Sequence, residues 1–211
     1  MASETRPVTG FDRIELRGIG KMTIAEAPVA GLVIEAEPDI LPEIVTEVTG
    51  QTLVISFRTL SALFTPGIFH PVVFAVSLPR LAAVSLVGAG TVTGGGLRCA
   101  DVAVTLSGSG AISLGLHAEA LTATVAGAGR VSFAGRARTF DARISGAGEC
   151  DASALETLGT RVEIAGAGSA TVRVRDTLDA TVSGAGTIRY YGSPQIVQKI
   201  SGLGSVKPAE G

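Results

Sequence analysis

The stretch SGSGAISLGLHAEALTATVAGAGRVSFAGRARTFDARISGAG, Ser107 to Gly148, contains three Gly-x-Gly triplets at a constant spacing of 19 residues. From residue 88 onward, seven such triplets recur at intervals of 18 to 20 residues, starting at Gly88, Gly108, Gly127, Gly146, Gly166, Gly184 and Gly202. A further triplet, Gly18-Ile19-Gly20, stands near the N-terminus. A fixed period of this length is typical of a repeat architecture.

Alignment of the copies on their first glycine shows an alternation of apolar and polar positions. The residue two places before the glycine is a branched aliphatic in every copy: Leu86, Leu106, Val125, Ile144, Ile164, Val182 and Ile200. The positions four before and four after the glycine are also mostly apolar, whereas those three and five before it are mostly polar. This period of two predicts β-strands, with the glycines in the turns between them.

These features predict an all-β fold, a parallel β-helix (β-solenoid) with coils of 18–20 residues and seven Gly-x-Gly corners. We expect two or three short strands in each coil, and coils stacked roughly 4.8 Å apart so that their aliphatic side chains form continuous interior ladders. Glycine suits the corner because it tolerates positive φ and has no side chain to crowd the next coil. In this register Asp141, Arg161 and Asp179 are neighbours on adjacent coils, which predicts a solvated salt-bridge ladder rather than a catalytic group.

The N-terminal third departs from this regular pattern. Around Gly18, Ile14 and Leu16 precede the glycine by four and two residues, and Met22 and Ile24 follow it by four and six. This segment is therefore expected to add one more edge or cap to the same solenoid. Beyond it, we expect a short helix over Asp39–Val48 that ends near Gly50. We also expect three strands, over Leu32–Ala36, Thr52–Phe57 and Val72–Leu78.

The length of 211 residues is sufficient for one domain with a substantial core. We assign residues 11–206 to a single β-helix domain, with 11–78 as an N-terminal capping part and 79–206 as the regular repeats. Residues 1–10 are expected to form a disordered or cloning-derived tail, and residues 207–211 a second tail.

The apolar segment 58–71 is the most distinctive local feature outside the repeat. Leu63, Phe64, Ile68 and Phe69 are concentrated there. They are expected either to fold over an exposed side or open end of the solenoid, or to form a subunit contact or an apolar binding patch. Tyr191 is expected to point outward and is the fifth candidate interaction residue, because an exposed tyrosine can stack on a sugar.

The glycine triplets do not fit a phosphate-binding loop, because each is followed by a strand pattern instead of a helix. We predict no catalytic residue, no cofactor and no metal. The densest carboxylates, Glu149, Asp151, Asp176 and Asp179, are spread over loops and outer faces, whereas a glycan hydrolase needs an acid and a base clustered together. The two histidines, His70 and His117, are isolated, and no Cys or His spacing suggests a metal site.

The two cysteines, Cys99 and Cys150, lie in coils too far apart for a disulfide. Cys150 falls in the aliphatic ladder between Val131 and Ala170, which predicts a small buried side chain.

Composition limits the partners. The net charge is −2, only 4% of the residues are aromatic, and no basic stripe is interleaved with aromatics, so nucleic-acid binding is not expected. No run of about 18 apolar residues predicts a membrane-spanning helix. The opening MASETRPVTG has no charged segment followed by an apolar one, so no signal peptide is predicted. The sequence itself leaves a cytoplasmic location open.

With the repeat aligned, the chain resembles the bacterial head GIN domain family, described as putative autotransporter adhesins. The resemblance runs from about Phe11 to Val206. It is carried by the opening FDRIELRGIGKMTI, by the SGSG and SGAG corners, and most specifically by the ending SGAGTIRYYGSPQIVQKISGLGSV. Members often carry Asp or Asn after the second glycine, where this chain has Thr, Ala, Arg, Glu, Ser, Thr and Ser. The resemblance implies a β-helical, extracytoplasmic or cell-surface domain and supplies no catalytic or binding residues.

Together these observations favour a non-enzymatic surface or interaction domain, with a protein or glycan as its partner. Two alternatives remain open at this point. One is a structural module that self-assembles by stacking coils end to end, or forms a homo-oligomer through the 58–71 loop. The other is a glycan-active β-helix enzyme.

Overall fold

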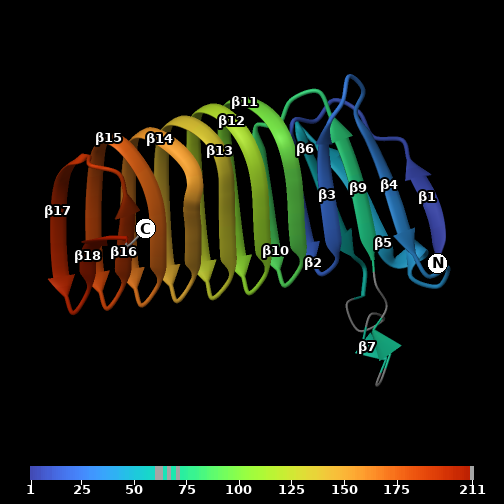
Figure 1. The fold of residues 1–211 in the computed structure, drawn as a ribbon. Coiled ribbons are helices and arrows are strands. Elements are labelled where there is room, and N and C mark those ends of the chain that lie inside the picture. Colours follow the sequence, from blue (N-terminus) through green and yellow to red (C-terminus); the bar gives the residue numbers. More distant parts are fainter. Residues whose placement is uncertain (60–63, 66–67, 70–71, 210–211) are drawn as a thin grey trace.

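The computed structural model describes residues 1–59, 64–65, 68–69 and 72–209, most of which form one stack of parallel β-coils (Figure 1). Five long strands make up its body, and each runs from one Gly-x-Gly corner to the next: β11 (Thr91–Gly108), β12 (Ala111–Gly127), β13 (Arg130–Gly146), β14 (Glu149–Gly166) and β15 (Ser169–Gly184). Consecutive members pair in parallel. The predicted all-β parallel solenoid is confirmed.

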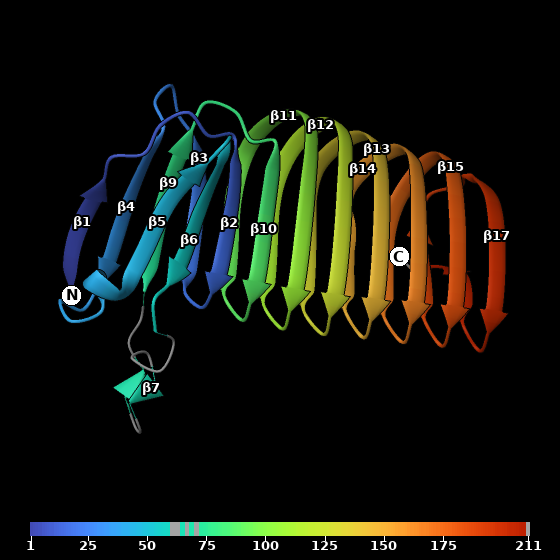
Figure 2. The ribbon, with the colours of Figure 1, turned by 180° about the vertical axis from the view of Figure 1, so that it is seen from behind.

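Each of these five coils contains one long bent strand instead of the two or three short strands expected. The strand turns sharply at its glycine corner and bends smoothly on the opposite side, where successive strands form an arch (Figure 2). The ladder continues around this bend because the neighbouring parallel strand bends with it. The arch is formed by residues 98–100, 117–119, 136–138, 156–158 and 173–175 of β11 to β15.

The aliphatic ladders have the predicted register residue for residue. The residues two before each corner are paired in the order Leu86, Leu106, Val125, Ile144, Ile164, Val182 and Ile200. The first six are at most 2% exposed. Burying one such side chain contributes roughly 1.5–3 kcal/mol, so these ladders supply the main stabilisation of the stack.

The outer face carries the predicted charge ladder. Arg161 Nη2 lies 2.8 Å from Asp179 Oδ2, and Arg143 Nη2 lies 2.9 Å from Asp141 Oδ2. Arg143 Nε also lies 3.9 Å from a carboxylate oxygen of Glu163 on the next coil. Because these pairs are exposed, each is worth only about 0–1 kcal/mol. These ion pairs therefore contribute little to the stability of the stack, which depends on the buried ladders.

The N-terminal part forms the first coils and closes that end of the solenoid. β2 (Arg13–Gly18) and β3 (Lys21–Glu26) pair in parallel with β10 (Ala83–Gly88) and β11, with Gly18 opposite Gly88. β6 (Thr52–Phe57) and β9 (Val73–Leu78) add a further parallel layer. Three strands then extend the sheet by antiparallel pairing: β5 (Ile44–Thr49) pairs with β6, β4 (Gly31–Ala36) with β9, and β1 (Ala2–Arg6) with β4. The expectation that this segment adds to the same solenoid is confirmed, and the assignment of residues 11–78 to a capping part stays a prediction.

The helix expected over Asp39–Val48 is wrong for most of that range. Only the 3-10 helix η1 (Leu41–Glu43) forms, with Pro42 in its first turn, and β5 begins at Ile44. The run IVTEVT is rich in β-branched residues and can pair with β6, which favours a strand. The segments expected to be tails also differ from expectation, because β1 begins at Ala2 and β18 (Ser205–Pro208) extends to Pro208.

Within the apolar 58–71 segment, β7 (Phe64–Thr65) and β8 (Ile68–Phe69) form a small antiparallel hairpin. β7 projects from the body on the corner side of the coils (Figures 1 and 2). Leu63 lies outside the described residues. The assignment of Phe64, Ile68 and Phe69 to an interaction surface stays a prediction.

The C-terminal end differs from the capped N-terminal end. β16 (Thr187–Tyr191), β17 (Gln195–Gly202) and β18 form the last coil, and every residue of β17 is exposed. The inward-facing Ile196 and Ile200 are 37% and 42% exposed because no described strand lies beyond them.

The glycine corners set how closely the coils approach. Ala128 N donates to Gly108 O at 3.1 Å and Arg130 N to Gly110 O at 3.0 Å, so the ladder passes through the corner itself. Gly127 has φ of +121°, and a Cβ placed on it would lie 2.5 Å from Gly108 O. Both the backbone angle and the contact therefore require glycine.

Gly127→Ala should lower the free energy of unfolding by at least about 2 kcal/mol, because it adds backbone strain and a backbone clash. The matched control is Gly95→Ala, since a Cβ at Gly95 meets no atom within 4 Å. Urea denaturation followed by far-ultraviolet circular dichroism measures both variants. Equal losses would contradict the view that the corner contact sets the coil spacing.

Candidate binding groove

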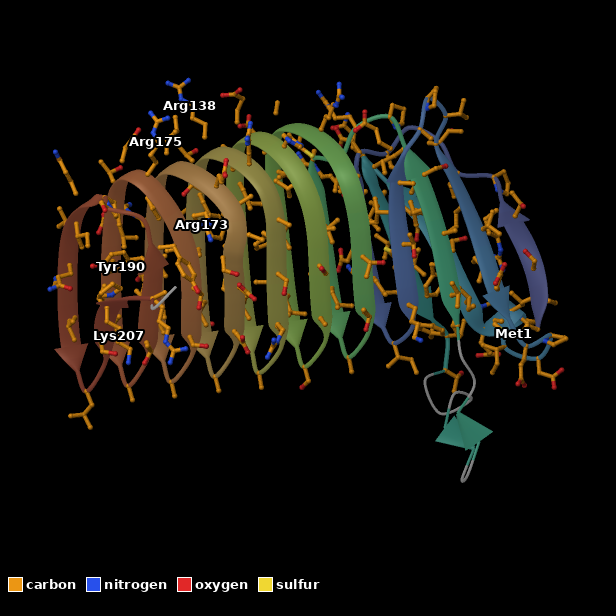
Figure 3. The ribbon with its side chains drawn as sticks, viewed as in Figure 1. Met1, Arg138, Arg173, Arg175, Tyr190 and Lys207 are labelled. Atoms are coloured by element: carbon orange, nitrogen blue, oxygen red, sulfur yellow. The ribbon has the colours of Figure 1, made fainter. Side chains whose placement is uncertain are left out.

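A groove of about 1180 Å³ crosses the arch from Cys99 on β11 to Ser193 after β16. It runs across the strands, along the solenoid axis, and Arg138, Arg173 and Arg175 are among the residues that line it. Figure 3 shows Arg138 and Arg175 above the crest of the arch and Arg173 lower on its side. Each of β12 to β15 contributes one outward residue to either side of the groove and one residue between them. The groove therefore belongs to the stack and not to any single coil.

The side chains of the groove fall into three rows. Row one consists of residues that pair from coil to coil: His117, Arg136, Glu156 and Arg173. The same register continues beyond the groove lining to Arg98 at one end and to Tyr191 at the other. Row two stands two residues further along the strands: Glu119, Arg138, Leu158 and Arg175. The floor between the two rows is formed by residues with small or buried side chains: Cys99, Ala118, Ala137, Thr157 and Val174.

The groove follows from the alternation of the strand on a convex bend. Successive side chains point to opposite faces, so rows one and two both face outward and splay apart on a convex surface. The floor residues point inward, and nothing projects between the rows. Thr157 is the polar residue of the floor, and its hydroxyl lies 2.7 Å from that of Thr160 and donates to Arg173 O at 2.8 Å.

A bulge in β14 positions Arg173 in the groove. Ala152 pairs with Val172 and Glu156 pairs with Arg173, so residues 153–155 of β14 have no register partner on β15. The carbonyl of Ser153 accepts a 2.8 Å hydrogen bond from Arg173 Nε, and the guanidinium lies 4.9 Å from the centroid of the Tyr191 ring. Bulges commonly re-aim side chains in this way, and this one holds Arg173 without engaging a carboxylate.

The groove is positively charged although the chain is not. Its lining contains four arginines and two glutamates, a local charge of +2, whereas the whole chain has a net charge of −2. Arg136 Nε donates to Glu156 at 3.1 Å, and Arg175 Nε donates to Asp176 at 2.8 Å. The hydrogen bond to Asp176, and then that carboxylate's charge, raise the pKa of Arg175. Among the described residues Arg138 has no ion-pair partner, and Arg173 has only a carbonyl and a ring.

None of the four carboxylates considered from the sequence is among the residues that line the groove, and each of the four has a partner. Glu149 pairs with Arg130 at 2.6 Å, and Asp151 Oδ1 accepts from the hydroxyl of Ser153 at 2.6 Å. Asp179 pairs with Arg161 on the outer face, and Asp176 with its neighbour Arg175.

The histidines and cysteines occupy different environments. His117 lies at the arch in row one, within β12, while His70 lies outside the described residues. Cys99 and Cys150 are both free and buried, and Cys150 stands between Val131 and Ala170 as predicted. Within the described part of the chain, no group of three or more His, Cys, Asp or Glu is placed to hold a metal. No helix of the described residues has the length and apolar character needed to span a membrane.

Burial raises the pKa of both thiols. The pKa of Cys150 rises to about 12, mainly through desolvation and then through the charges of Asp151 and Glu149. The pKa of Cys99 rises to about 11, through desolvation and then through Glu26. Both thiols are therefore protonated and weakly nucleophilic near neutral pH.

Sequence reasoning named one candidate interaction residue beside the groove and none of the residues that line it. Tyr191 was expected on the outer face, and it stands at the end of row one beside Arg173. The four arginines were missed because alignment on the glycines loses register in mid-coil, where bulges change the spacing. A signal was present in the repeated Arg-x-Arg of residues 136–138 and 173–175, two coils apart.

Comparison with known proteins identifies relatives of this fold. The sequence model of the family described as "putative auto-transporter adhesin, head GIN domain" matches residues 10–194. A putative adhesin from Bacteroides fragilis superposes with a TM-score of 0.89 at 23% identity, covering 99% of this chain and 96% of that one. A putative lipid binding protein from Parabacteroides distasonis gives 0.78 at 19% identity with the same coverage. No curated protein matches the chain. At these identities the solved structures support the fold alone.

The Cys150 thiol should make stability depend on pH. An unfolded thiol has a pKa near 8.5, so the stabilisation by the neutral folded thiol is complete below that pH and is lost as pH rises toward 12. Between pH 8 and 10, the native chain should lose about 2 kcal/mol more stability than Cys150→Ala. Urea denaturation at both pH values measures the difference, and parallel losses in the two proteins would contradict it.

Proposed function

Since the chain belongs to the family described as "putative auto-transporter adhesin, head GIN domain", we propose that it is a non-enzymatic interaction domain that binds an extracytoplasmic ligand in the arch groove. The observation that carries the proposal is the continuity of the groove across β11 to β15, with exposed charged side chains on both rims. Solenoids use extended surfaces of this kind to bind their partners.

The chemistry of the groove suits binding better than hydrolysis. A glycan hydrolase needs one carboxylic acid to protonate the leaving group and a second carboxylate to act as base or nucleophile. In the groove, Glu156 is held by Arg136, and Glu119 stands in the other row. The arginines keep their charge at all physiological pH values, so they hold anionic or polar groups and do not exchange protons.

A steric block of the groove tests this proposal. Leu158 is 37% exposed in row two, so Leu158→Cys should fold normally and react with a polyethylene glycol maleimide, whereas the buried thiols of Cys99 and Cys150 should not. The modified protein should lose most of its binding on an array of surface glycans and extracellular matrix proteins. The native chain, which lacks the Leu158→Cys substitution, is treated with the same reagent as the control for reaction at the buried thiols.

The matched control is Val87→Cys with the same polymer, because Val87 is 41% exposed outside the groove. Its binding should equal that of the native chain. If blocking at residue 158 has no effect, or both modified proteins lose binding equally, the groove is not the binding surface. Cleavage of any array glycan would contradict a non-enzymatic role.

A second candidate function, self-assembly, is favoured by the exposed C-terminal coil. Ile196 and Ile200 face inward along β17 yet are partly exposed, and Leu203 at the last corner is 92% exposed. An unpaired edge with apolar side chains is a surface on which another strand can add. A second copy of the chain would then extend the stack or form an end-to-end pair.

Sedimentation velocity over a hundredfold range of concentration tests the assembly proposal. A chain that associates through β17 should show a rising sedimentation coefficient, which Ile200→Lys abolishes by placing a charge at the open end. Val87→Lys, on an outer face, should leave the association unchanged. A native chain that stays monomeric throughout contradicts self-assembly, as does association that survives Ile200→Lys.

A further inference from the structure

From the placement of four arginines in the groove, we infer that its ligand is an extended acidic polysaccharide that lies along the solenoid axis. Its carboxylates or sulfates would be held by Arg138 and Arg173. This inference rests on the proposed function and specifies the ligand class for the same groove. It starts from the spacing of the charges, which the coil repeat fixes.

The arginines come in two pairs, each separated by two coils. In row one, Arg136 and Arg173 are separated by Glu156, and in row two Arg138 and Arg175 are separated by Leu158. With coils about 4.8 Å apart, the members of each pair are spaced by roughly 10 Å along the axis. A disaccharide in an extended chain has a comparable length. A polysaccharide with one anionic group per disaccharide therefore places a charge at every second coil.

Two of the four arginines are available for a new anion. Arg136 and Arg175 already donate to Glu156 and Asp176. Arg138 has no ion-pair partner among the described residues, and the guanidinium of Arg173 is positioned by Ser153 and Tyr191 without neutralisation. Guanidinium groups recognise carboxylate and sulfate oxygens through paired hydrogen bonds, and a group that is already oriented loses less entropy on binding.

The remaining features of the groove favour a sugar chain over other polyanions. Nucleic-acid binding needs several aromatic side chains on which bases stack, and along this groove only Tyr191 stands at one end of row one. Glu119 and Glu156 would repel a densely charged polymer but can accept hydrogen bonds from sugar hydroxyls. A long open groove with charged rims also lacks the enclosed apolar walls expected around a lipid chain.

Titration calorimetry with defined oligosaccharides tests the inference on the full chain. The probe is a hyaluronate decasaccharide, whose glucuronate and N-acetylglucosamine alternate so that one carboxylate occurs per disaccharide. It should bind, with affinity that falls as salt concentration rises. Uncharged dextran of equal length should not bind detectably. Chondroitin sulfate, which adds a sulfate to the same repeat, should bind at least as tightly.

The double variant Arg138→Gln/Arg173→Gln should weaken hyaluronate binding by at least roughly tenfold, because both free guanidinium groups are lost. The matched control is Arg143→Gln/Arg161→Gln, which removes the same charge from the outer-face ladder outside the groove. Its affinity should change less than about twofold. Circular dichroism of both proteins establishes that the fold is retained.

Several outcomes would overturn the inference. Equal losses of hyaluronate affinity in the two double variants would show that the binding is non-specific charge attraction. Equal binding of dextran would show that the ligand does not need an anionic group. Arginine-dependent binding to single-stranded DNA or to phosphatidylglycerol vesicles, without binding to hyaluronate or chondroitin sulfate, would assign another ligand class. If no acidic glycan binds but the polymer block at residue 158 still abolishes an interaction on the array, this inference fails while the proposed function stands.

Discussion

The stacking of one glycine corner on the next is the contact on which the rest of this structure depends. At Gly127, a side chain would meet the carbonyl of Gly108 at 2.5 Å, and the same close approach recurs at the other corners. Because the backbone ladder passes through the corner, every coil starts in register with its neighbour. This register brings Leu106, Val125 and Ile144 together as a buried ladder. The apolar ladder supplies the energy, and the corner determines which residues share it.

The same constraint separates the roles of the two ends of each coil. At the corner, backbone packs on backbone, so length and residue type have little freedom. The part of the coil that leads into the arch tolerates extra residues, as the bulge at residues 153–155 of β14 shows. That bulge frees the carbonyl of Ser153 to hold Arg173. The coils therefore differ in length, between 18 and 20 residues, in and beside the arch and not at the corners. The groove lies in this variable part of the coil.

Much of the fold could be predicted from the sequence because its information is periodic. The ladder through Leu86 and Ile164, the pairing of Arg161 with Asp179 and the position of Cys150 all followed from alignment on the glycines. The prediction of a short helix over Asp39–Val48 was wrong, because a local pattern of ten residues cannot show that β6 will pair with this segment. The groove was missed for a related reason. Bulges shift the pairing between neighbouring coils before the arch is reached. The residues that become neighbours in the rows therefore cannot be found by counting residues from the glycine corners alone.

A repeat protein and a linear polymer can match each other along one dimension. The coils recur at a fixed distance, so charged side chains that occur on alternate coils are spaced by twice the distance between coils. This spacing does not depend on the details of each loop. Here β13 and β15 each contribute two arginines, and β14 between them contributes Glu156 and Leu158. One arginine on each of β13 and β15 is neutralised within the protein, which leaves Arg138 and Arg173 on opposite rims and two coils apart. A ligand that satisfies both must cross the groove as it advances along it, and this geometry is that of a chain and not of a single small anion.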